Sequence, residues 1–158
     1  MKKYILRVFR QLIIALFKPI VQAIMYEEIR IKGDPHRLKL SPNTSMTNTF
    51  FNTNSGWIEV GDYTFTGYNV SIITGSHSYR LFLEERMKSQ ESGRDIFIGK
   101  GVWIGSNAVI LGPCKIGNHA VIAAGAVVPP HSEIAPGSIV AGIPAKSIKT
   151  IDIEKIPE

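Results

Sequence analysis

The side chains best suited to proton transfer in this chain of 158 residues are its four histidines. An imidazole titrates near neutral pH, so it can accept a proton from a hydroxyl group and return it later. His77 stands at the start of a segment rich in charged residues, a position typical of a functional loop. We expect the other three histidines to be solvated: His36 lies before the repeats described below, His119 occupies a turn position, and His131 follows two prolines. His77 is therefore the candidate for acid–base chemistry.

Composition limits the other chemistry that is available. Cys114 is the single cysteine, so the chain cannot form an internal disulfide or a cysteine cluster for zinc. Hydrophobic residues make up 44% of the sequence and charged residues 20%, which is typical of one soluble domain in a reducing compartment. The net charge of +5 suits a phosphate-bearing ligand or an anionic lipid surface. We expect no nucleic-acid partner.

A six-residue repeat must position His77. The second half of the chain has an isoleucine or valine at every sixth position, and an alternation of this period fits neither an α-helix nor a β-hairpin. The repeated positions are Ile98, Ile104, Ile110, Ile116, Ile122, Val128, Ile134 and Val140. Short strands joined by tight turns do fit the period, and they predict a chain that coils with these side chains stacked inside it.

The same pattern occurs upstream and is interrupted once. Val60, Thr66 and Ile72 share the inward position, and Ser76 falls where each hexapeptide has a small residue. The next repeat, at Ile98, comes about twenty residues too late, so we expect a loop inserted over residues 78–95.

Residues 1–26 form a separate segment that is too short in uncharged stretches to cross a bilayer. Helical spacing gathers its basic and amide side chains into a narrow stripe opposite a broad apolar face; the stripe contains Lys3, Arg7, Arg10, Gln11, Lys18 and Gln22. We predict an amphipathic helix, with Pro19 as a site for a kink. Its apolar face would either pack on this protein or lie on a membrane surface.

The repeats resemble those of the hexapeptide-repeat acyltransferases, and most closely the bacterial sugar and polysaccharide O-acetyltransferases of the maltose and galactoside acetyltransferase type. The similar segments are VGDYTFTGYNVSIITGSH, IGKGVWIGSNAVILGPCKIGNHAVIAAGAVV and AGIPAKSIK. The resemblance implies an all-β fold, a left-handed parallel β-helix with three hexapeptides per turn. It also implies a homotrimer that binds acetyl-CoA in a groove between subunits.

The family's motif, together with the chemistry and position of individual side chains, suggests roles for several residues. His77 matches the catalytic histidine. The predicted cofactor-binding residues are Trp103, Gly105, Ser106, Ala124, Lys146 and Lys149. The predicted acceptor-binding residues are Asn52, Asn54 and Tyr79. The sequence departs from the family at Pro129 and Pro130, where a Thr-Lys pair is usual. It departs again at Thr47 and Ser55, near which the sugar-binding asparagine and aspartate of the family would align.

The resulting hypothesis is direct acetyl transfer from acetyl-CoA to a hydroxyl group of a sugar or a lipid-linked polysaccharide precursor. The same machinery could instead acetylate an amino sugar nitrogen, an amino acid hydroxyl or an antibiotic, and a β-helix could serve as a scaffold without activity. Some proteins with this architecture bind zinc through three histidines, but no two histidines here have the required spacing, and no metal is expected.

The predicted organisation has three parts. Residues 1–30 form the helical segment, residues 31–150 form the β-helix with its inserted loop, and residues 151–158 form a tail. The expected location is cytoplasmic, with peripheral contact at the inner face of the membrane through residues 1–26.

Overall fold

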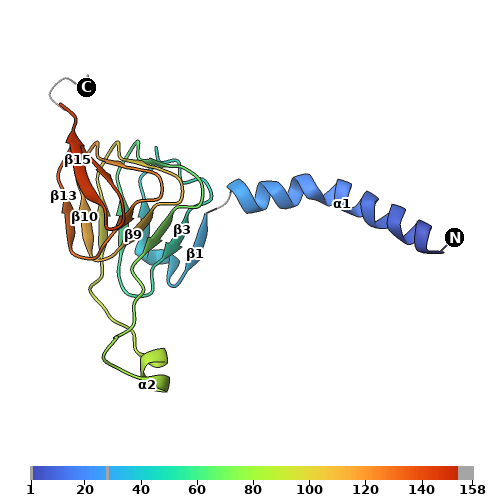
Figure 1. The fold of residues 1–158 in the computed structure, drawn as a ribbon, viewed down its shortest axis with the longest axis horizontal. Coiled ribbons are helices and arrows are strands. Elements are labelled where there is room, and N and C mark those ends of the chain that lie inside the picture. The colour runs from blue at the N-terminus through green and yellow to red at the C-terminus, as the bar shows by residue number, and fades with distance from the viewer. Residues whose placement is uncertain (1, 28, 153–158) are drawn as a thin grey trace.

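The structure is a computed structural model that describes residues 2–27 and 29–152. Short strands coil about one axis and form three parallel sheets, while a long helix, α1 (Lys2–Glu27), leaves from the N-terminal end of the coil (Figure 1). The structure confirms the predicted parallel β-helix, the inserted loop and the N-terminal helix. The helix continues through Pro19.

Each sheet forms one side of the coil and contains five strands. Sheet A consists of β1 (Arg30–Lys32), β3 (Phe50–Asn52), β6 (Ser71–Ile73), β9 (Val109–Leu111) and β12 (Val127–Val128). Sheet B consists of β2 (Leu38–Leu40), β4 (Ile58–Val60), β7 (Ile96–Ile98), β10 (Cys114–Ile116) and β13 (Ser132–Ile134). Sheet C consists of β5 (Phe65–Thr66), β8 (Trp103–Ile104), β11 (Val121–Ile122), β14 (Ser138–Ala141) and β15 (Lys146–Thr150).

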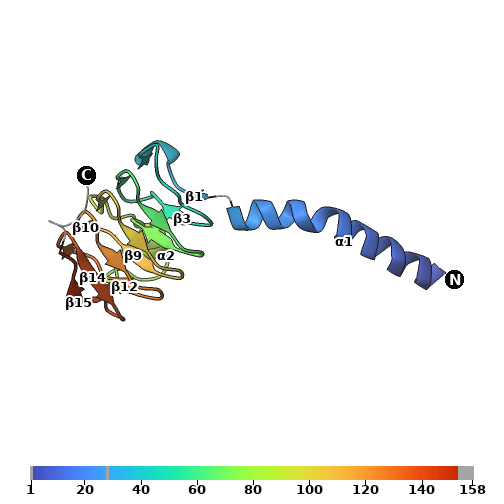
Figure 2. The same ribbon diagram turned by 90° about the horizontal axis from the view of Figure 1, so that it is seen from above.

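The chain passes from sheet A to sheet B to sheet C and then begins the next turn of the coil. A short 3-10 helix (Pro35–Arg37) joins β1 to β2. β15 runs antiparallel to β14 and closes the C-terminal end of sheet C, whereas the other strand pairs of the three sheets are parallel. We call the edge between sheets A and B the A–B corner, and the edge between sheets C and A the C–A corner. Figure 2 shows the successive turns from above.

The inward side chains form columns along the axis, as the six-residue period predicted. In sheet A, Phe51, Ile72, Ile110 and Val128 occupy paired positions and are fully buried. Ile104 and Ile122 form the corresponding column in sheet C. Burial of these branched side chains removes apolar surface from water and provides the main stabilisation of the coil.

Cys114 is part of this packing. Its side chain lies inside sheet B, where burial raises the pKa of the thiol from 9.0 to about 12. The group therefore stays a neutral thiol and packs as a small apolar residue in one of the positions where the repeat requires one.

The inserted loop begins four residues earlier than the spacing predicted. β6 ends at Ile73, and residues 74–95 connect it to β7 and contain a short helix, α2 (Leu83–Lys88). Thr74 is fully buried, and its side chain donates a hydrogen bond to the Asn52 carbonyl oxygen at 2.8 Å. Ser76 consequently lies in the loop, not at the small-residue position that the repeat assigned to it.

Two further elements begin or end near the divisions expected from the sequence. The helical segment ends at Glu27, and the first strand begins at Arg30. The predicted tail starts directly after β15, but residues 153–158 lie outside the described part of the chain.

Candidate active site

A small pocket of about 200 Å³ opens at the A–B corner, where the inserted loop leaves the coil. Its lining comes from two consecutive turns of the coil and from both ends of the loop. The lining residues are Lys32, Asn52, Asn54, Ser55, Gly75, Ser76, His77 and Gln90. The structure thus brings together the predicted base, His77, and two of the three predicted acceptor-binding residues.

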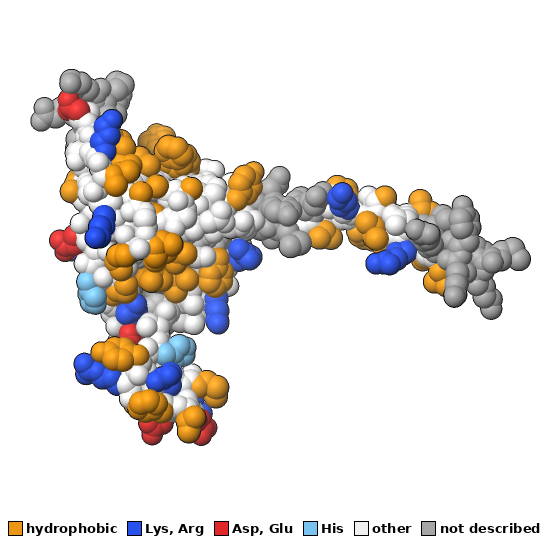
Figure 3. Space-filling model, viewed as in Figure 1, with side chains coloured by type: hydrophobic (Ala, Val, Ile, Leu, Met, Phe, Trp, Pro, Cys, Tyr) orange, Lys and Arg blue, Asp and Glu red, His pale blue; other side chains and the backbone are white. Residues whose placement is uncertain are grey.

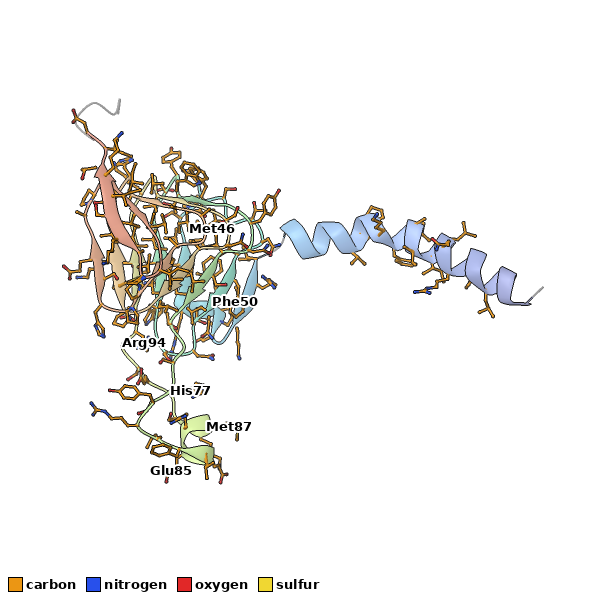
Figure 4. The ribbon with its side chains drawn as sticks, viewed as in Figure 1. Met46, Phe50, His77, Glu85, Met87 and Arg94 are labelled. Carbon is orange, nitrogen blue, oxygen red and sulfur yellow. The ribbon has the colours of Figure 1, made fainter. Side chains whose placement is uncertain are left out.

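The base of the loop is a neck in which the outgoing and returning chains lie side by side. Backbone and side-chain hydrogen bonds join Glu91 to Ser76 at 3.5 Å and Ser78 to Ser89 at 3.2 Å. His77 lies between these two links, so its backbone is held on both sides. Figure 4 shows His77 in the neck between the coil and α2, which forms the far end of the loop.

Arg94 fastens the neck to the coil. Its Nε donates to the Thr74 carbonyl oxygen at 2.9 Å, and its Nη1 pairs with Glu91 Oε2 at 3.1 Å. The Arg94 side chain is only 14% exposed, so this ion pair is less screened than a surface pair. Arg94 therefore joins Thr74, the first residue of the loop, to Glu91 on the returning end of the loop.

Asn52 lies at the floor of the pocket beside the neck. Its Oδ1 accepts a hydrogen bond from the Asn54 backbone N–H at 3.0 Å. A Cβ atom on Gly75 would lie 2.6 Å from the same oxygen, so glycine allows the neck to approach this closely. The Asn52 amide is half-buried and keeps further hydrogen-bonding capacity toward the pocket.

Tyr79 does not line this pocket. Its side chain is 76% exposed on the loop, and the Arg80 guanidinium lies 5.6 Å from the centre of its ring. The predicted acceptor role of Tyr79 therefore stays a prediction and requires either loop movement or a contact with another copy.

Lys32, Ser55 and Gln90 line the pocket and were not predicted from the sequence. Strand register places Lys32 next to Asn52 on the neighbouring turn. A spacing of about twenty residues between the first two turns, had it been recognised in the sequence, would have indicated this pairing. The hydroxyl oxygen of Ser55 is buried and has no hydrogen-bond partner among the described residues. Gln90 lies at the pocket because the returning end of the loop packs beside its outgoing end, and the repeat pattern of the sequence does not indicate this contact.

The predicted cofactor-binding residues lie elsewhere on the coil. Trp103 is half exposed on the outer face of sheet C, and its ring stacks with Phe65 at 6.1 Å between centroids. Ser106 and Ala124 lie one above the other at the C–A corner. Lys146 and Lys149 are exposed on β15 at the end of the same sheet.

Gly105 differs from the other members of this set. It is buried, and a Cβ atom there would lie 2.5 Å from the Ala124 backbone nitrogen. Stacking of adjacent turns already requires its small size. Ser106 likewise stabilises the corner, because its Oγ accepts a hydrogen bond from the Tyr68 backbone N–H at 3.1 Å.

The two groups of residues occupy opposite edges of sheet A. His77 and its pocket lie at the A–B corner, whereas Ser106 and Ala124 lie at the C–A corner. A single chain therefore does not bring the predicted base and the predicted cofactor-binding residues together.

Comparison with known families agrees with the observed coil. The profile described as bacterial transferase hexapeptide (six repeats) matches residues 95–130. The chain carries bacterial transferase hexapeptide repeats. The family resemblance inferred from the sequence is thereby confirmed.

Several solved structures have the same fold as this hexapeptide-repeat domain. A maltose O-acetyltransferase from Clostridium difficile 630 is 29% identical with a TM-score of 0.55, over 79% of this chain and 67% of that one. A galactoside acetyltransferase in complex with coenzyme A is 25% identical with a TM-score of 0.59, over 80% of this chain and 66% of that one. The chain thus spans about two thirds of the length of these two proteins.

A third solved structure supports only the similarity of fold. It is a hexapeptide-repeat acetyltransferase from Vibrio cholerae O1 biovar eltor, complexed with acetyl-coenzyme A, which is 24% identical with a TM-score of 0.55, over 86% of this chain and 77% of that one. A search among curated proteins gives no match.

The other histidines of the hexapeptide-repeat domain have structural surroundings that differ from the pocket. The backbone of His119 and His131 is in the left-handed region, with φ of 59° and 64°, at turns of the coil. The His36 backbone N–H donates to Asp34 Oδ1 at 2.9 Å. Within residues 2–27 and 29–152, no three His, Cys, Asp or Glu side chains are grouped as metal ligands would be.

Proposed function

We propose that this hexapeptide-repeat domain is an acetyl-CoA-dependent O-acetyltransferase that modifies a hydroxyl group of a sugar or of a polysaccharide precursor. The observation that carries the proposal is the pocket at the A–B corner, which combines an exposed imidazole with half-buried amide groups. Amide side chains suit the recognition of neutral hydroxyl groups, because they donate and accept hydrogen bonds without a net charge. The maltose and galactoside acetyltransferases of the same fold support the class of reaction.

His77 acts as the general base in this proposal. An acceptor hydroxyl held by Asn52 and Asn54 donates its proton to an imidazole nitrogen of His77 as its oxygen forms the new ester bond. Acetyl-CoA, when bound, supplies the acetyl group as a thioester whose carbon–sulfur bond breaks in the same reaction. His77 then returns the proton to the departing sulfur, so that the imidazole is regenerated.

The residues on sheet C suit the binding of coenzyme A. The stacked Phe65 and Trp103 rings offer a half-exposed aromatic surface for an extended chain such as pantetheine. Lys146 and Lys149 offer two exposed ammonium groups for phosphates.

The separation of the two groups favours a site formed between copies of the chain. The A–B corner of one copy would face the C–A corner of the next, which brings His77 opposite Ser106 and Ala124 of the neighbouring copy. A closed ring of three copies repeats this contact around a threefold axis and leaves every site complete.

Exposed apolar surface supports the same assembly. Half-buried apolar side chains cover the outer face of sheet A between the two corners; they are Phe50, Ile73, Val109, Leu111 and Val127. Figure 3 shows apolar side chains gathered over β9 and β3. At the tip of the loop, Phe82, Leu83 and Met87 are 70%, 91% and 71% exposed. Apolar patches of this kind mark contact surfaces.

The outward valines of three hexapeptides, Val109, Val121 and Val127, do not all share one face. Val109 and Val127 are neighbours on sheet A, whereas Val121 lies on sheet C between Trp103 and Ile139. Two sides of the coil therefore present apolar residues, as a contact between unlike faces requires.

We expect the protein to be a trimer. Light scattering coupled to gel filtration should give a mass near three times 17.5 kDa at micromolar concentration. A stable species of one chain under these conditions would contradict the shared site.

Replacement of Asn52 tests the acceptor pocket. Asn52→Ala removes the amide at its floor and is expected to raise the KM for the acceptor about fivefold, because a neutral hydrogen bond contributes about 1 kcal/mol. The KM for acetyl-CoA should change little. Asn43→Ala is the matched control, since Asn43 is exposed and pairs with Asp62 far from the loop. An unchanged acceptor KM in Asn52→Ala would assign the pocket another role.

The reaction itself is tested by release of free thiol from acetyl-CoA. The full chain is incubated with a panel of monosaccharides, oligosaccharides and lipid-linked sugars, and the products are analysed for O-acetyl esters by mass spectrometry. Acceptor-dependent thiol release with an ester product supports the proposal. Release that depends only on amines would show N-acetylation instead.

A further inference from the structure

The N-terminal helix α1 lies clear of the coil. Figures 1 and 2 show it leaving the first turn and extending away from the three sheets. Its large apolar side chains from Leu6 to Val21 whose burial is described are between 42% and 67% exposed. The coil thus leaves the described apolar side chains of this helix largely uncovered.

The exposed side chains of α1 are sorted into two sides. Gln11 and Lys18 are seven residues apart, which is about two helical turns, and so they share one side. Leu12 and Leu16 lie on the opposite side, four residues apart, and Phe9 is on the same side. This apolar side is broader than the narrow seam of two positions in seven that a coiled coil uses.

The charged residues of α1 are almost all basic. Its sequence contains five basic residues, Lys2, Lys3, Arg7, Arg10 and Lys18, and a single acidic residue, Glu27. Like charges on identical helices repel one another, which disfavours a bundle made of copies of α1. The same charges favour an anionic surface.

We propose that α1 binds the surface of an anionic lipid bilayer, with its apolar side buried among the acyl chains and its basic residues at the level of the headgroups. No described helix is long and apolar enough to cross a membrane. An amphipathic helix with a broad apolar side and a basic polar side lies in the plane of the interface. Three copies of α1 leaving the same end of a trimer would bind one membrane together and strengthen the attachment.

The test is sedimentation of the full-length protein with vesicles of phosphatidylcholine that contain about 30% phosphatidylglycerol. The protein should sediment with these vesicles at low salt and be released at about 1 M salt, where the Debye length is short. Vesicles of phosphatidylcholine alone should bind less protein. The readout does not depend on catalysis, so its outcome is separate from that of the acetyl-transfer assay.

Paired substitutions in the full chain separate membrane contact from a structural role. The double variant Leu12→Gln with Leu16→Gln should weaken vesicle binding about 100-fold, since it removes two buried leucines without changing charge. Ile14→Gln with Val21→Gln is the matched control near the polar side and should lose much less. Arg10→Gln with Lys18→Gln should weaken binding about tenfold or more on anionic vesicles only.

Three outcomes would overturn the proposal. The first is a full-length protein that stays in the supernatant with anionic vesicles at low salt. The second is equal loss of binding in the Leu12/Leu16 and Ile14/Val21 variants. The third is a Leu12/Leu16 variant that no longer forms the oligomer of the unaltered protein while vesicle binding is unchanged, which would make α1 an assembly element.

Discussion

Replacing His77 with alanine should lower the rate of acetyl transfer by about 10² to 10⁴, the usual contribution of a general base. The loss should appear in kcat, because the imidazole acts on the proton of the acceptor in the transition state. Calorimetric binding of coenzyme A should be unchanged, since His77 acts on the acceptor proton and the predicted cofactor contacts come from other residues. His77→Gln should be equally inactive, because an amide forms hydrogen bonds but does not accept a proton at neutral pH.

His131→Asn is the control for this experiment. His131 is exposed and adopts a φ of 64°, and asparagine tolerates this left-handed conformation better than alanine does. The control should retain nearly full activity. Turnover close to normal in His77→Ala, or recovery of activity in His77→Gln, would remove the general base from the mechanism.

Ile116→Ala should cause the largest loss of stability. Ile116 is 3% exposed and lies in sheet B between Ile98 and Ile134, which occupy the same position on adjacent turns. Truncation of a buried isoleucine leaves a cavity that the regular coil cannot close, and it costs about 2–5 kcal/mol. The free energy of unfolding should be measured in urea at a fixed protein concentration, because assembly contributes to it.

Lys115→Ala is the matched control for this substitution. Lys115 is the neighbouring residue on the same strand and points outward into solvent. Its removal should change the free energy of unfolding by no more than about 0.5 kcal/mol. Equal effects of the two substitutions would mean that the inward column does not carry the stability of the coil.

The regular part of this fold is predictable because each hexapeptide adds the same unit. The period placed Ile104, Ile110 and Ile122 inside the coil, and all three are fully buried. The period fails upstream of β4, and the two paired residues Phe51 and Ile72 are 21 positions apart because the second turn has a longer A–B corner. Periodic reasoning therefore missed the first turn and its contribution to the pocket.

The candidate site was predictable only in part for a similar reason. His77 and Asn52 could be named from their type and position, but their contact depends on where the loop leaves the coil. Thr74 determines that point through its buried hydrogen bond to Asn52, and no repeat signals it. Whether residues at two corners form one site depends on contacts between chains, which a repeat within one chain does not encode.

The clasp formed by Arg94 has a consequence for how this protein could change during evolution. Because Arg94 ties Thr74 to Glu91, the insertion leaves and re-enters the coil at nearly the same point. Lengthening a flexible loop between fixed ends costs little, about 0.6 kcal/mol for each doubling. Residues 79–88 can therefore be exchanged, extended or shortened while the neck and the stacked turns stay intact. The loop is a cassette through which a lineage, or a protein engineer, could give the same coil a different acceptor.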